Sequence, residues 1–384
     1  MLTAELAAHK ARLGLGASVS YGRAMRAIAE SITPLCVHFG VCGGCAHQDM
    51  APGAYRAMKR DLVVNALARQ GFSDAVVGEI VEVPPATRRR AVLKVAKLNG
   101  AVLIGFHAAR SHAIVDMRKC HVLTPRLFAL VAGLREMMTG LLREGETAEL
   151  HVTDTDAGFD VSIDWKRAND PATNATVARL ASKLKLARVT AKGQTLTELA
   201  QPLVRFGKAD VKLPANAFLQ PTREGEAALQ ARVLAATKGA RHIADLFAGL
   251  GTFALPLAER ARVHAVEREG AMLEALAAAA RATQGLKPLT TETRDLFKQP
   301  LTVPELTGFD AAVLNPPRAG ALAQARALAQ SKVGRVAYVS CDPASFARDA
   351  RVLVDGGYRM GAVLPVDQFL WSSHIELVAA FARK

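Results

Sequence analysis

The sequence predicts an α/β fold: a doubly wound, mostly parallel sheet in the C-terminal part, preceded by an α+β region. After Gly239, short apolar segments alternate with Ala- and Leu-rich segments of helical spacing. Because parallel strands are joined by crossover helices, this alternation predicts a sheet with helices on both faces. The expected strands are 242–247, 263–267, 311–314, 335–340 and a final strand at 375–382, and the expected helices include 271–283 and 321–331.

The region before residue 216 has a different pattern. Alternating apolar runs between Ala91 and Val115 surround an Asn99-Gly100 turn, which predicts a β-hairpin. The other elements expected here are a strand pair at 148–153 and 159–164 and a helix with a basic face at 55–70. We therefore expect a helical lead-in (1–33), a cysteine-rich loop with the start of the α+β region (34–125), the remainder of that region (126–215) and the parallel-sheet domain (216–384).

Composition places the chain among globular proteins, because half of its residues are hydrophobic. No segment resembles a signal peptide or a membrane span, so we expect a cytoplasmic monomer with no membrane partner. Of the net charge of +14, residues 241–384 contribute 17 Lys and Arg against 14 Asp and Glu, or +3, which leaves 32 against 21, or +11, for the first 240 residues. A basic N-terminal part favours a polyanionic partner such as nucleic acid, although an ordinary solvated surface would give the same count.

The segment from Asp245 to Phe253, Asp-Leu-Phe-Ala-Gly-Leu-Gly-Thr-Phe, follows the first expected strand and opens a helix. Gly249 and Gly251 let the backbone turn tightly and approach a ligand at the carboxyl edge of the sheet. Glu267 ends the next expected strand, where a carboxylate can accept hydrogen bonds from a ribose diol. The same spacing fits the dinucleotide fingerprint, so an NAD-dependent enzyme is an alternative at this point.

Further strand ends carry polar groups to the same edge of the sheet. Asp295 follows the third strand region, where a carboxylate commonly meets an adenine amino group. Asn315 follows the fourth strand and precedes two stiffening prolines, and Cys341 follows the fifth strand within Ser-Cys-Asp-Pro. Hydride transfer needs none of these groups, whereas alkyl transfer onto a poor nucleophile can use all of them. The pattern therefore favours methyl transfer.

A cysteine and a carboxylate at one sheet edge suit methylation of carbon 5 of uracil, which is a weak nucleophile. A thiolate that adds to carbon 6 makes carbon 5 nucleophilic, and a base must later remove the carbon 5 proton so that the thiolate is eliminated. Cys341 is the expected nucleophile and Glu376, in the last strand, the expected base, with His374 beside it. Singly, each is more often a packing cysteine or a surface carboxylate, so the prediction depends on their combination with the nucleotide-type site.

The remaining four cysteines predict a second kind of site. Cys36, Cys42 and Cys45 lie close together, and Cys120 lies far downstream. Four thiolates hold either zinc or an iron–sulfur cluster, and structural zinc usually has two C-x2-C pairs. Three cysteines in one loop with a fourth far away are more typical of [4Fe–4S]. We expect that cluster, in a structural or RNA-positioning role, and zinc is the alternative.

Together these motifs resemble the bacterial uracil-5 RNA methyltransferases, in particular the iron–sulfur-containing members that act on 23S ribosomal RNA. The resemblance runs from about residue 34 to the C-terminus and rests on Cys36–Cys45 with Cys120, Asp245–Phe253, Pro316–Gly320, Val339–Pro343 and His374–Glu376. It implies a class I methyltransferase (Rossmann-like) domain, S-adenosyl-L-methionine as methyl donor, RNA as partner, and [4Fe–4S] on the four cysteines. It also implies Cys341 as nucleophile and Glu376 as base, and cofactor contacts at Gln220, Phe247, Thr252, Glu267, Asp295 and Asn315.

The sequence departs from the family pattern in two places. Family members usually have Asp where Asn315 stands, so the expected cofactor site has one negative charge fewer. Many members begin with a small β-barrel RNA-binding domain, for which the 35 residues before Cys36 are too few, so we expect RNA to bind mainly to the middle region. The candidate phosphate contacts there are Arg88, Arg89, Arg90, Lys94, Lys97, Arg110, Arg118 and Lys119.

Three alternative functions remain open. Asn-Pro-Pro also begins a motif of amino-group methyltransferases, but Arg318 stands where those enzymes have an aromatic residue, and Cys341 would have no role. A non-catalytic iron–sulfur RNA-binding protein is the alternative from a different class, and intact Cys341 and Glu376 argue against it. A tRNA uracil-5 methyltransferase would differ only in the RNA that it modifies.

Overall fold

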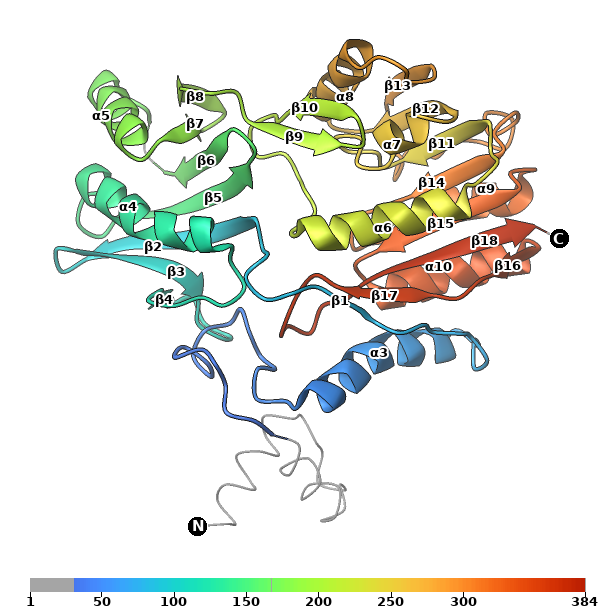
Figure 1. The fold of residues 1–384 in the computed structure, drawn as a ribbon, viewed down its shortest axis with the longest axis horizontal. Helices are drawn as coiled ribbons and strands as arrows, with labels where there is room; N and C mark the ends of the chain where they lie inside the picture. The colour runs from blue at the N-terminus through green and yellow to red at the C-terminus, as the bar shows by residue number, and fades with distance from the viewer. Residues whose placement is uncertain (1–30, 167, 384) are drawn as a thin grey trace.

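The computed structural model describes residues 31–166 and 168–383, so all but the last three residues of the helical lead-in expected at 1–33 lie outside the described residues. Two large sheets lie side by side, one in the middle of the chain and one in its C-terminal part (Figure 1). The middle domain comprises β2 (Arg90–Leu98), β3 (Ala101–His107), β4 (Ile114–Asp116), α4 (Pro125–Leu141), β5 (Thr147–Thr155), β6 (Gly158–Trp165), α5 (Pro171–Lys183), β7 (Leu186–Ala191) and β8 (Gln194–Glu198).

The middle domain is an α+β unit, as the sequence predicts. Its sheet has the strand order β4-β3-β2-β5-β6-β7-β8. The β2–β3 hairpin turns at Asn99 and Gly100, which have φ angles of 53° and 77°. Both residues therefore adopt the left-handed conformation that a two-residue hairpin turn requires. Helices α4 and α5 supply apolar side chains such as Leu134 and Val177 to a core shared with the strands.

The C-terminal domain follows, with the separate two-stranded sheet of β9 and β10, the second large sheet and their helices. Their bounds are β9 (Leu203–Phe206), β10 (Ala209–Lys212), α6 (Arg223–Ala236), β11 (His242–Leu246), α7 (Ala254–Ala258), β12 (Arg262–Glu267), α8 (Gly270–Ala282), β13 (Leu289–Thr293), β14 (Ala311–Leu314), α9 (Leu322–Gln330), β15 (Arg335–Ser340), α10 (Pro343–Asp355), β16 (Tyr358–Met360), β17 (Leu364–Asp367) and β18 (Glu376–Arg383). Two earlier elements join this domain, α3 (Pro52–Ala68) and β1 (Val81–Glu82).

The strand order confirms the predicted doubly wound architecture. The sheet runs β1-β17-β18-β15-β14-β11-β12-β13, with β16 also paired to β18. β13, β12, β11, β14 and β15 are parallel, whereas β18 is antiparallel to β15 on one side and to β17 on the other. The chain leaves β11 first toward β12 and later toward β14, and ligands bind at such a reversal, beyond the carboxyl ends of the strands.

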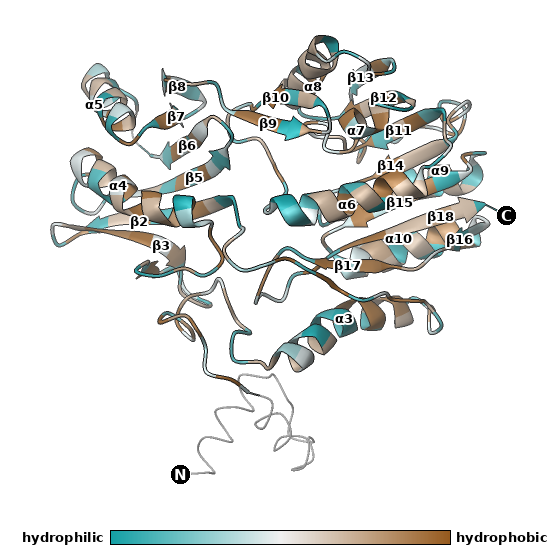
Figure 2. Cartoon of the chain, viewed as in Figure 1, coloured by the Kyte–Doolittle hydropathy of each residue, from teal (hydrophilic) through white to brown (hydrophobic). Residues whose placement is uncertain are grey.

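Each face of this sheet is covered by helices, because successive strand residues are apolar on both sides. On β11, Ile243 packs in one core with α6, α7 and α8, and Ala244 packs in the other with α3, α9 and α10. On β14, Val313 packs in the first of these two cores and Leu314 packs in the second. Figure 2 accordingly shows the central strands mostly brown, whereas helices such as α10 carry both colours.

The N-terminal part of the chain packs against both domains. α3 packs against α10, and β1 pairs in parallel with β17. The residues between Pro52 and Glu82 are therefore part of the C-terminal domain in space, although the expected division places them in the range 34–125. The hairpin of β9 and β10 packs against α8 in the same way. Within the described residues, no helix has the length and apolar character needed to cross a membrane.

Candidate active site

A cavity of about 480 Å³ opens at the carboxyl edge of the parallel strands. Its volume lies within the usual range for small-molecule sites. Its lining contains every residue that the sequence predicts for catalysis and cofactor binding: Gln220, Phe247, Thr252, Glu267, Asp295, Asn315, Cys341 and Glu376. The fold thus brings these residues together from several strand ends, and their individual roles stay predictions.

The glycine-rich turn after β11 forms one wall of this cavity. Phe247, Gly249 and Gly251 have φ angles of 63°, 54° and 88°, so the chain reverses sharply between β11 and α7. A Cβ atom at Gly251 would lie 2.3 Å from a methyl carbon of Leu276, which explains the need for glycine there. Glu267 supports the turn, because its Oε2 accepts a hydrogen bond from the Gly249 N–H at 3.0 Å.

Cys341 and Glu376 leave adjacent antiparallel strands at the same edge. Ser340 is paired with Leu377, so the next residue on β15 and the preceding residue on β18 are Cys341 and Glu376. Both side chains line the cavity, the thiol half-buried and the carboxyl 4% exposed. The register of these two strands thus brings a thiol and a carboxyl group to the same cavity.

Burial shifts the titration of both groups. It raises the pKa of the Cys341 thiol to about 11, with a further rise from the negative charge of Glu376, and Arg318 opposes the rise. Burial also raises the pKa of Glu376 to about 7, whereas a hydrogen bond from Gln368 lowers it. A carboxyl group with that pKa exchanges a proton readily near neutral pH, as a general base must.

The loop between β17 and β18 forms another wall and is fixed by a buried ion pair that the sequence does not predict. Lys59 of α3 donates hydrogen bonds to Asp367 at 2.7 Å and to the carbonyl oxygens of Phe369 and His374. The Tyr55 hydroxyl donates to Asp367 at 2.6 Å and accepts the N–H of Trp371 at 2.7 Å. The hydrogen bonds of these two buried side chains thus hold in place the segment that ends at Glu376.

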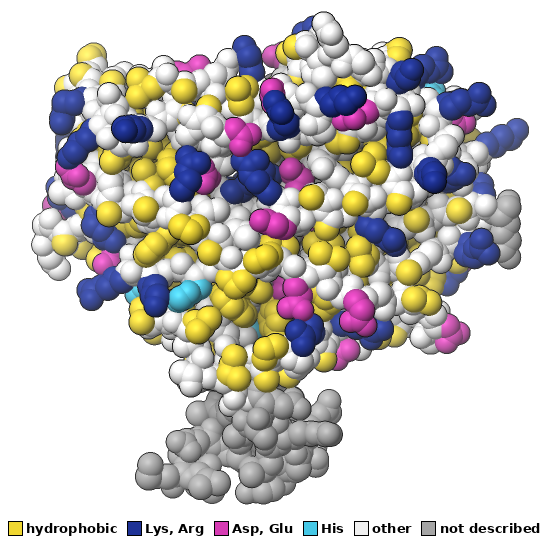
Figure 3. Space-filling view, in the orientation of Figure 1, with side chains coloured by type: hydrophobic (Ala, Val, Ile, Leu, Met, Phe, Trp, Pro, Cys, Tyr) yellow, Lys and Arg dark blue, Asp and Glu magenta, His cyan; other side chains and the backbone are white. Residues whose placement is uncertain are grey.

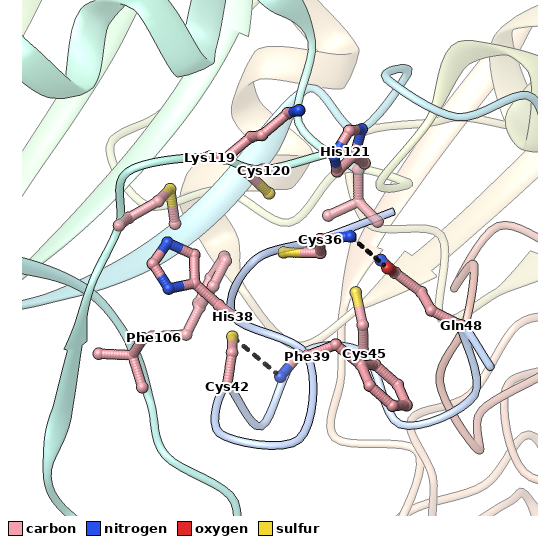
Figure 4. A pocket seen from close by; sticks show the side chains of 14 residues that line it. Cys36, His38, Phe39, Cys42, Cys45, Gln48, Phe106, Lys119, Cys120 and His121 are labelled. Carbon is pink, nitrogen blue, oxygen red and sulfur yellow. Dashed lines mark hydrogen bonds between the residues drawn. The ribbon is translucent and has the colours of Figure 1, made fainter. Parts of the chain in front are cut away.

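The four remaining predicted site cysteines surround a second, smaller cavity of about 30 Å³. In Figure 4 the thiols of Cys36, Cys42, Cys45 and Cys120 line the space between the cysteine loop and the chain before α4. Burial and the neighbouring thiols raise the pKa of Cys45 to about 12, and the Gly44 N–H lies 3.5 Å from the Cys42 sulfur. Among residues 31–166 and 168–383, no three His, Cys, Asp or Glu side chains are arranged to hold a single metal ion.

The cysteine loop is joined to both domains by backbone hydrogen bonds. The Gly43 N–H donates to His107 at the end of β3, and the Ala109 N–H donates to Val41, both at 2.9 Å. The N–H groups of Ala46 and His47 donate to the carbonyl oxygen of Trp371 at 2.8 and 3.1 Å. The loop therefore lies between the β3 end of the middle domain and the loop that precedes Glu376.

The structure corrects the predicted RNA contacts in the middle domain. Arg89 is 3% exposed, forms a 2.6 Å ion pair with Glu226 and donates to the carbonyl oxygen of Gln220, so it is wrong as a phosphate contact. Lys94 is paired with Glu149, and Lys97 donates to the carbonyl oxygens of Thr139 and Leu142 at the C-terminal end of α4. The candidates that remain exposed are Arg110, Arg118 and Lys119. On the face in Figure 3, Lys and Arg are spread among Asp and Glu and form no single patch.

Sequence reasoning missed four residues near the cavity. Arg318 and Phe369 line it, and Gln368 lies behind it in contact with Glu376. Lys59 was expected only as part of a basic helix face, although its side chain is fully buried. The family-like segment around Pro316 offered a signal for Arg318, whereas the contacts of Lys59 and Gln368 depend on chain segments far apart in the sequence.

The fold and the cavity are those of a Rossmann-like enzyme, and the comparisons with known proteins show that it is an RNA methyltransferase. No protein-family model matches the chain. An uncharacterized RNA methyltransferase of Brucella melitensis is 44% identical over 360 residues, which cover 94% of this chain and 86% of that protein. A 23S rRNA (uracil(1939)-C(5))-methyltransferase of Chromohalobacter salexigens is 35% identical over 370 residues, covering 92% and 77%. The chain therefore belongs to the RNA uracil-5 methyltransferase family.

A solved structure supports the fold assignment. The Pyrococcus abyssi tRNA (uracil-54, C5)-methyltransferase, in complex with S-adenosyl-L-homocysteine, superposes with a TM-score of 0.69. The match covers 90% of this chain and 86% of that one at 21% sequence identity. At that identity the likeness establishes the shared fold.

Proposed function

We propose that this protein methylates carbon 5 of a uridine in RNA with S-adenosyl-L-methionine, through a covalent bond between Cys341 and carbon 6 of the base. The observation that carries the proposal is that Cys341 and Glu376, each next to the paired residues Ser340 and Leu377 of β15 and β18, line one cavity. The cofactor residues predicted from the sequence line the same cavity. The relationship to a 23S rRNA uracil-C5 methyltransferase supports the same reaction.

The residues of the cavity fit S-adenosylmethionine. The glycine turn leaves room at the end of β11, and Glu267, Asp295 and Asn315 offer hydrogen-bonding groups around it. When bound, the cofactor supplies an electrophilic methyl group. Gln220, Phe247 and Thr252 complete the proposed cofactor contacts.

Cys341 and Glu376 divide the chemistry between them. The Cys341 thiolate forms a bond to carbon 6, and the electrons of the carbon 5–carbon 6 double bond move to oxygen 4, so carbon 5 becomes nucleophilic. After carbon 5 has received the methyl group, the Glu376 carboxylate removes its proton. The electrons of that C–H bond restore the double bond, the bond from sulfur to carbon 6 breaks, and the thiolate is regenerated.

The resting thiol must lose its proton before it can attack. Because burial and Glu376 raise its pKa to about 11, Cys341 is protonated at neutral pH. Arg318 is the positive group that opposes this rise. We assign Arg318 the role of stabilising the thiolate as it forms.

RNA that contains 5-fluorouridine tests the proposed mechanism. Fluorine replaces the proton that Glu376 would remove, so the adduct cannot be resolved. The wild-type protein, incubated with this RNA and S-adenosylmethionine, should form a denaturation-resistant protein–RNA complex. Cys341→Ser should form none while still binding the cofactor. A folded, cofactor-binding wild-type protein that forms no adduct would contradict the mechanism.

We propose 23S ribosomal RNA as the substrate, on the basis of the 35% identical relative that acts on it. Mapping of 5-methyluridine in RNA from a deletion strain tests this proposal. Loss of one 5-methyluridine from 23S rRNA, restored by the wild-type gene, is the expected result. Loss from tRNA alone would assign the protein to the tRNA alternative.

We also propose that Cys36, Cys42, Cys45 and Cys120 bind a [4Fe–4S] cluster. A single zinc ion with Zn–S bonds of about 2.3 Å requires four sulfurs about 3.8 Å apart around one point. The four thiols here line one cavity, and three cysteines in one loop with a remote fourth are typical of a cubane whose four irons each take one thiolate. The predicted role is structural, because the reaction transfers no electrons.

Anaerobic purification tests the cluster. The protein should be brown and contain about four iron atoms per chain, and Cys45→Ser should lose both colour and iron. Stoichiometric zinc without iron would refute the assignment.

We further propose a cytoplasmic monomer, for which light scattering should give the mass of one chain, 40.8 kDa.

A further inference from the structure

Gln368 joins two residues of the candidate active site that lie on different parts of the chain. It follows β17 directly and is 2% exposed. Its Nε2 donates a hydrogen bond to Oε1 of Gln220 at 2.7 Å and to Oε2 of Glu376 at 3.1 Å. One amide group thus connects the proposed cofactor side of the cavity with the proposed base.

The direction of this amide is determined by its partners. Both neighbouring oxygens are acceptors, and an NH₂ group has two protons, so it satisfies both. The opposite orientation would place Oε1 against the ionised Glu376 carboxylate, which is repulsive. In the observed orientation Oε1 of Gln368 has no hydrogen-bond partner among the described residues.

The surroundings leave Gln368 little freedom. Its neighbour Asp367 is fixed by Lys59 and Tyr55. A Cβ atom at Gly225 would lie 2.6 Å from Oε1 and 2.8 Å from Cβ of Gln368, so the side chain packs tightly against the start of α6. The backbone carbonyl oxygen of Gln220 accepts a hydrogen bond from the Arg89 side chain. This bond holds Gln220, the other residue to which Gln368 donates, in place.

We propose that Gln368 is a positioning residue for proton removal from carbon 5: it binds Oε2 of Glu376, fixes the carboxylate relative to Gln220, and leaves Oε1 to accept the proton. This inference rests on the proposed role of Glu376 as the base. The donor also favours the ionised form of Glu376, because hydrogen bonds to a carboxylate lower its pKa. Asp367 on β17 is neutralised by Lys59, and the other titratable groups around the same cavity are Cys341, Arg318, Glu267, Arg268, Glu269, Arg294 and Asp295.

The test compares Gln368→Met with Gln324→Met. Methionine keeps the length of glutamine and removes the donor. Gln324 is a matched control, because it is fully buried and bonded to the backbone of Leu301 at 2.8 and 3.2 Å, outside the cavity lining. Single turnovers with an unmodified 23S rRNA transcript and methyl-labelled S-adenosylmethionine would follow two steps across a pH series: formation of the covalent adduct and release of methylated RNA.

Gln368→Met should form the adduct at nearly the wild-type rate but release methylated RNA about fivefold more slowly at pH 7. Its release profile should move to higher pH by about one unit, because a rise of one unit from a pKa of about 7 lowers the ionised fraction of the base at pH 7 from about 1/2 to about 1/11. Gln324→Met should keep the wild-type profile. If Gln368→Met does not fold, Gln368→Asn withdraws the amide from both acceptors and gives the same comparison.

The outcomes separate this inference from the proposed function. A wild-type protein that methylates no uridine contradicts the proposed function itself. An active wild type, with a Gln368→Met profile that is unshifted, overturns the role of Gln368. Equal losses in adduct formation and release, without a pH shift, would likewise overturn it, because they indicate a merely structural residue.

Discussion

Replacement of Lys59 by Met is expected to destabilise the C-terminal domain far more than the loss of an ordinary surface charge. The side chains of Lys59 and Asp367 are both 0% exposed, and the Nζ–Oδ1 distance is 2.7 Å. Without the ammonium group, Asp367 keeps the Tyr55 hydroxyl as a donor but has no counter-charge. Because a buried carboxylate without a counter-charge is strongly unfavourable, the expected loss in the free energy of unfolding is about 3–5 kcal/mol.

The loss in the free energy of unfolding should depend on how deeply the ion pair is buried and not on the distance between its nitrogen and oxygen atoms. Lys183 forms an ion pair of 2.6 Å with Glu136, and both side chains are 59% exposed. Lys183→Met should therefore cost at most about 1 kcal/mol. The double variant Lys59→Met/Asp367→Asn should recover more than half of the single variant's loss, because no buried charge is left without a partner.

Urea unfolding followed by tryptophan fluorescence measures these differences. The chain has two tryptophans, Trp165 in the middle domain and Trp371 in the loop that Lys59 fastens. A Trp165→Phe background makes Trp371 the reporter of the C-terminal domain. The reasoning would be refuted if Lys59→Met and Lys183→Met lost equal stability, or if the double variant were no more stable than Lys59→Met.

Three further predictions concern the candidate active site. Arg318→Met should slow formation of the 5-fluorouridine adduct, because the thiol pKa, already about 11, rises further when the opposing positive charge is removed; raising the pH should restore the rate, and a rate unaffected by the substitution would contradict this role. In the wild type, release of methylated RNA should increase with pH through about pH 7, since Glu376 removes a proton only when ionised; release that slows as the pH rises would exclude it as the base. Asn315→Asp should bind S-adenosylmethionine several-fold more tightly in calorimetry, because the carboxylate attracts the sulfonium charge, while neutral S-adenosylhomocysteine shows no gain; equal changes for both ligands would contradict this explanation.

The sequence was sufficient for the C-terminal sheet because local signals are strong there. β11, β12, β14, β15 and β18 all lie within one or two residues of the expected strands. Parallel strands present their carboxyl ends at one edge, so predicting the strands also predicted that Glu267, Asn315 and Cys341 line the same cavity. The prediction for the middle domain was less complete. Helix α4 was not predicted, although Thr124 and Pro125 carry an N-cap signal.

Contacts between distant segments could not be predicted in this way. The triplet from Arg88 to Arg90 suggested a phosphate-binding surface, yet Arg89 is buried against Glu226, 137 residues away in the sequence. Lys59 and Asp367 are separated by 308 residues. Charge and periodicity describe a residue's own segment, whereas burial of a charge depends on which partner the tertiary fold brings to it.

The division of chemistry between Cys341 and Glu376 can be tested most directly by trapping the intermediate on ordinary uridine RNA. Glu376→Gln keeps the shape of the side chain but cannot remove the carbon 5 proton, so the adduct should persist after methyl transfer. Protease and nuclease digestion followed by mass spectrometry should identify a methylated uridine nucleotide bound to the peptide that contains Cys341. Free 5-methyluridine released at the wild-type rate, or a nucleotide bound to any other residue, would contradict the proposed mechanism.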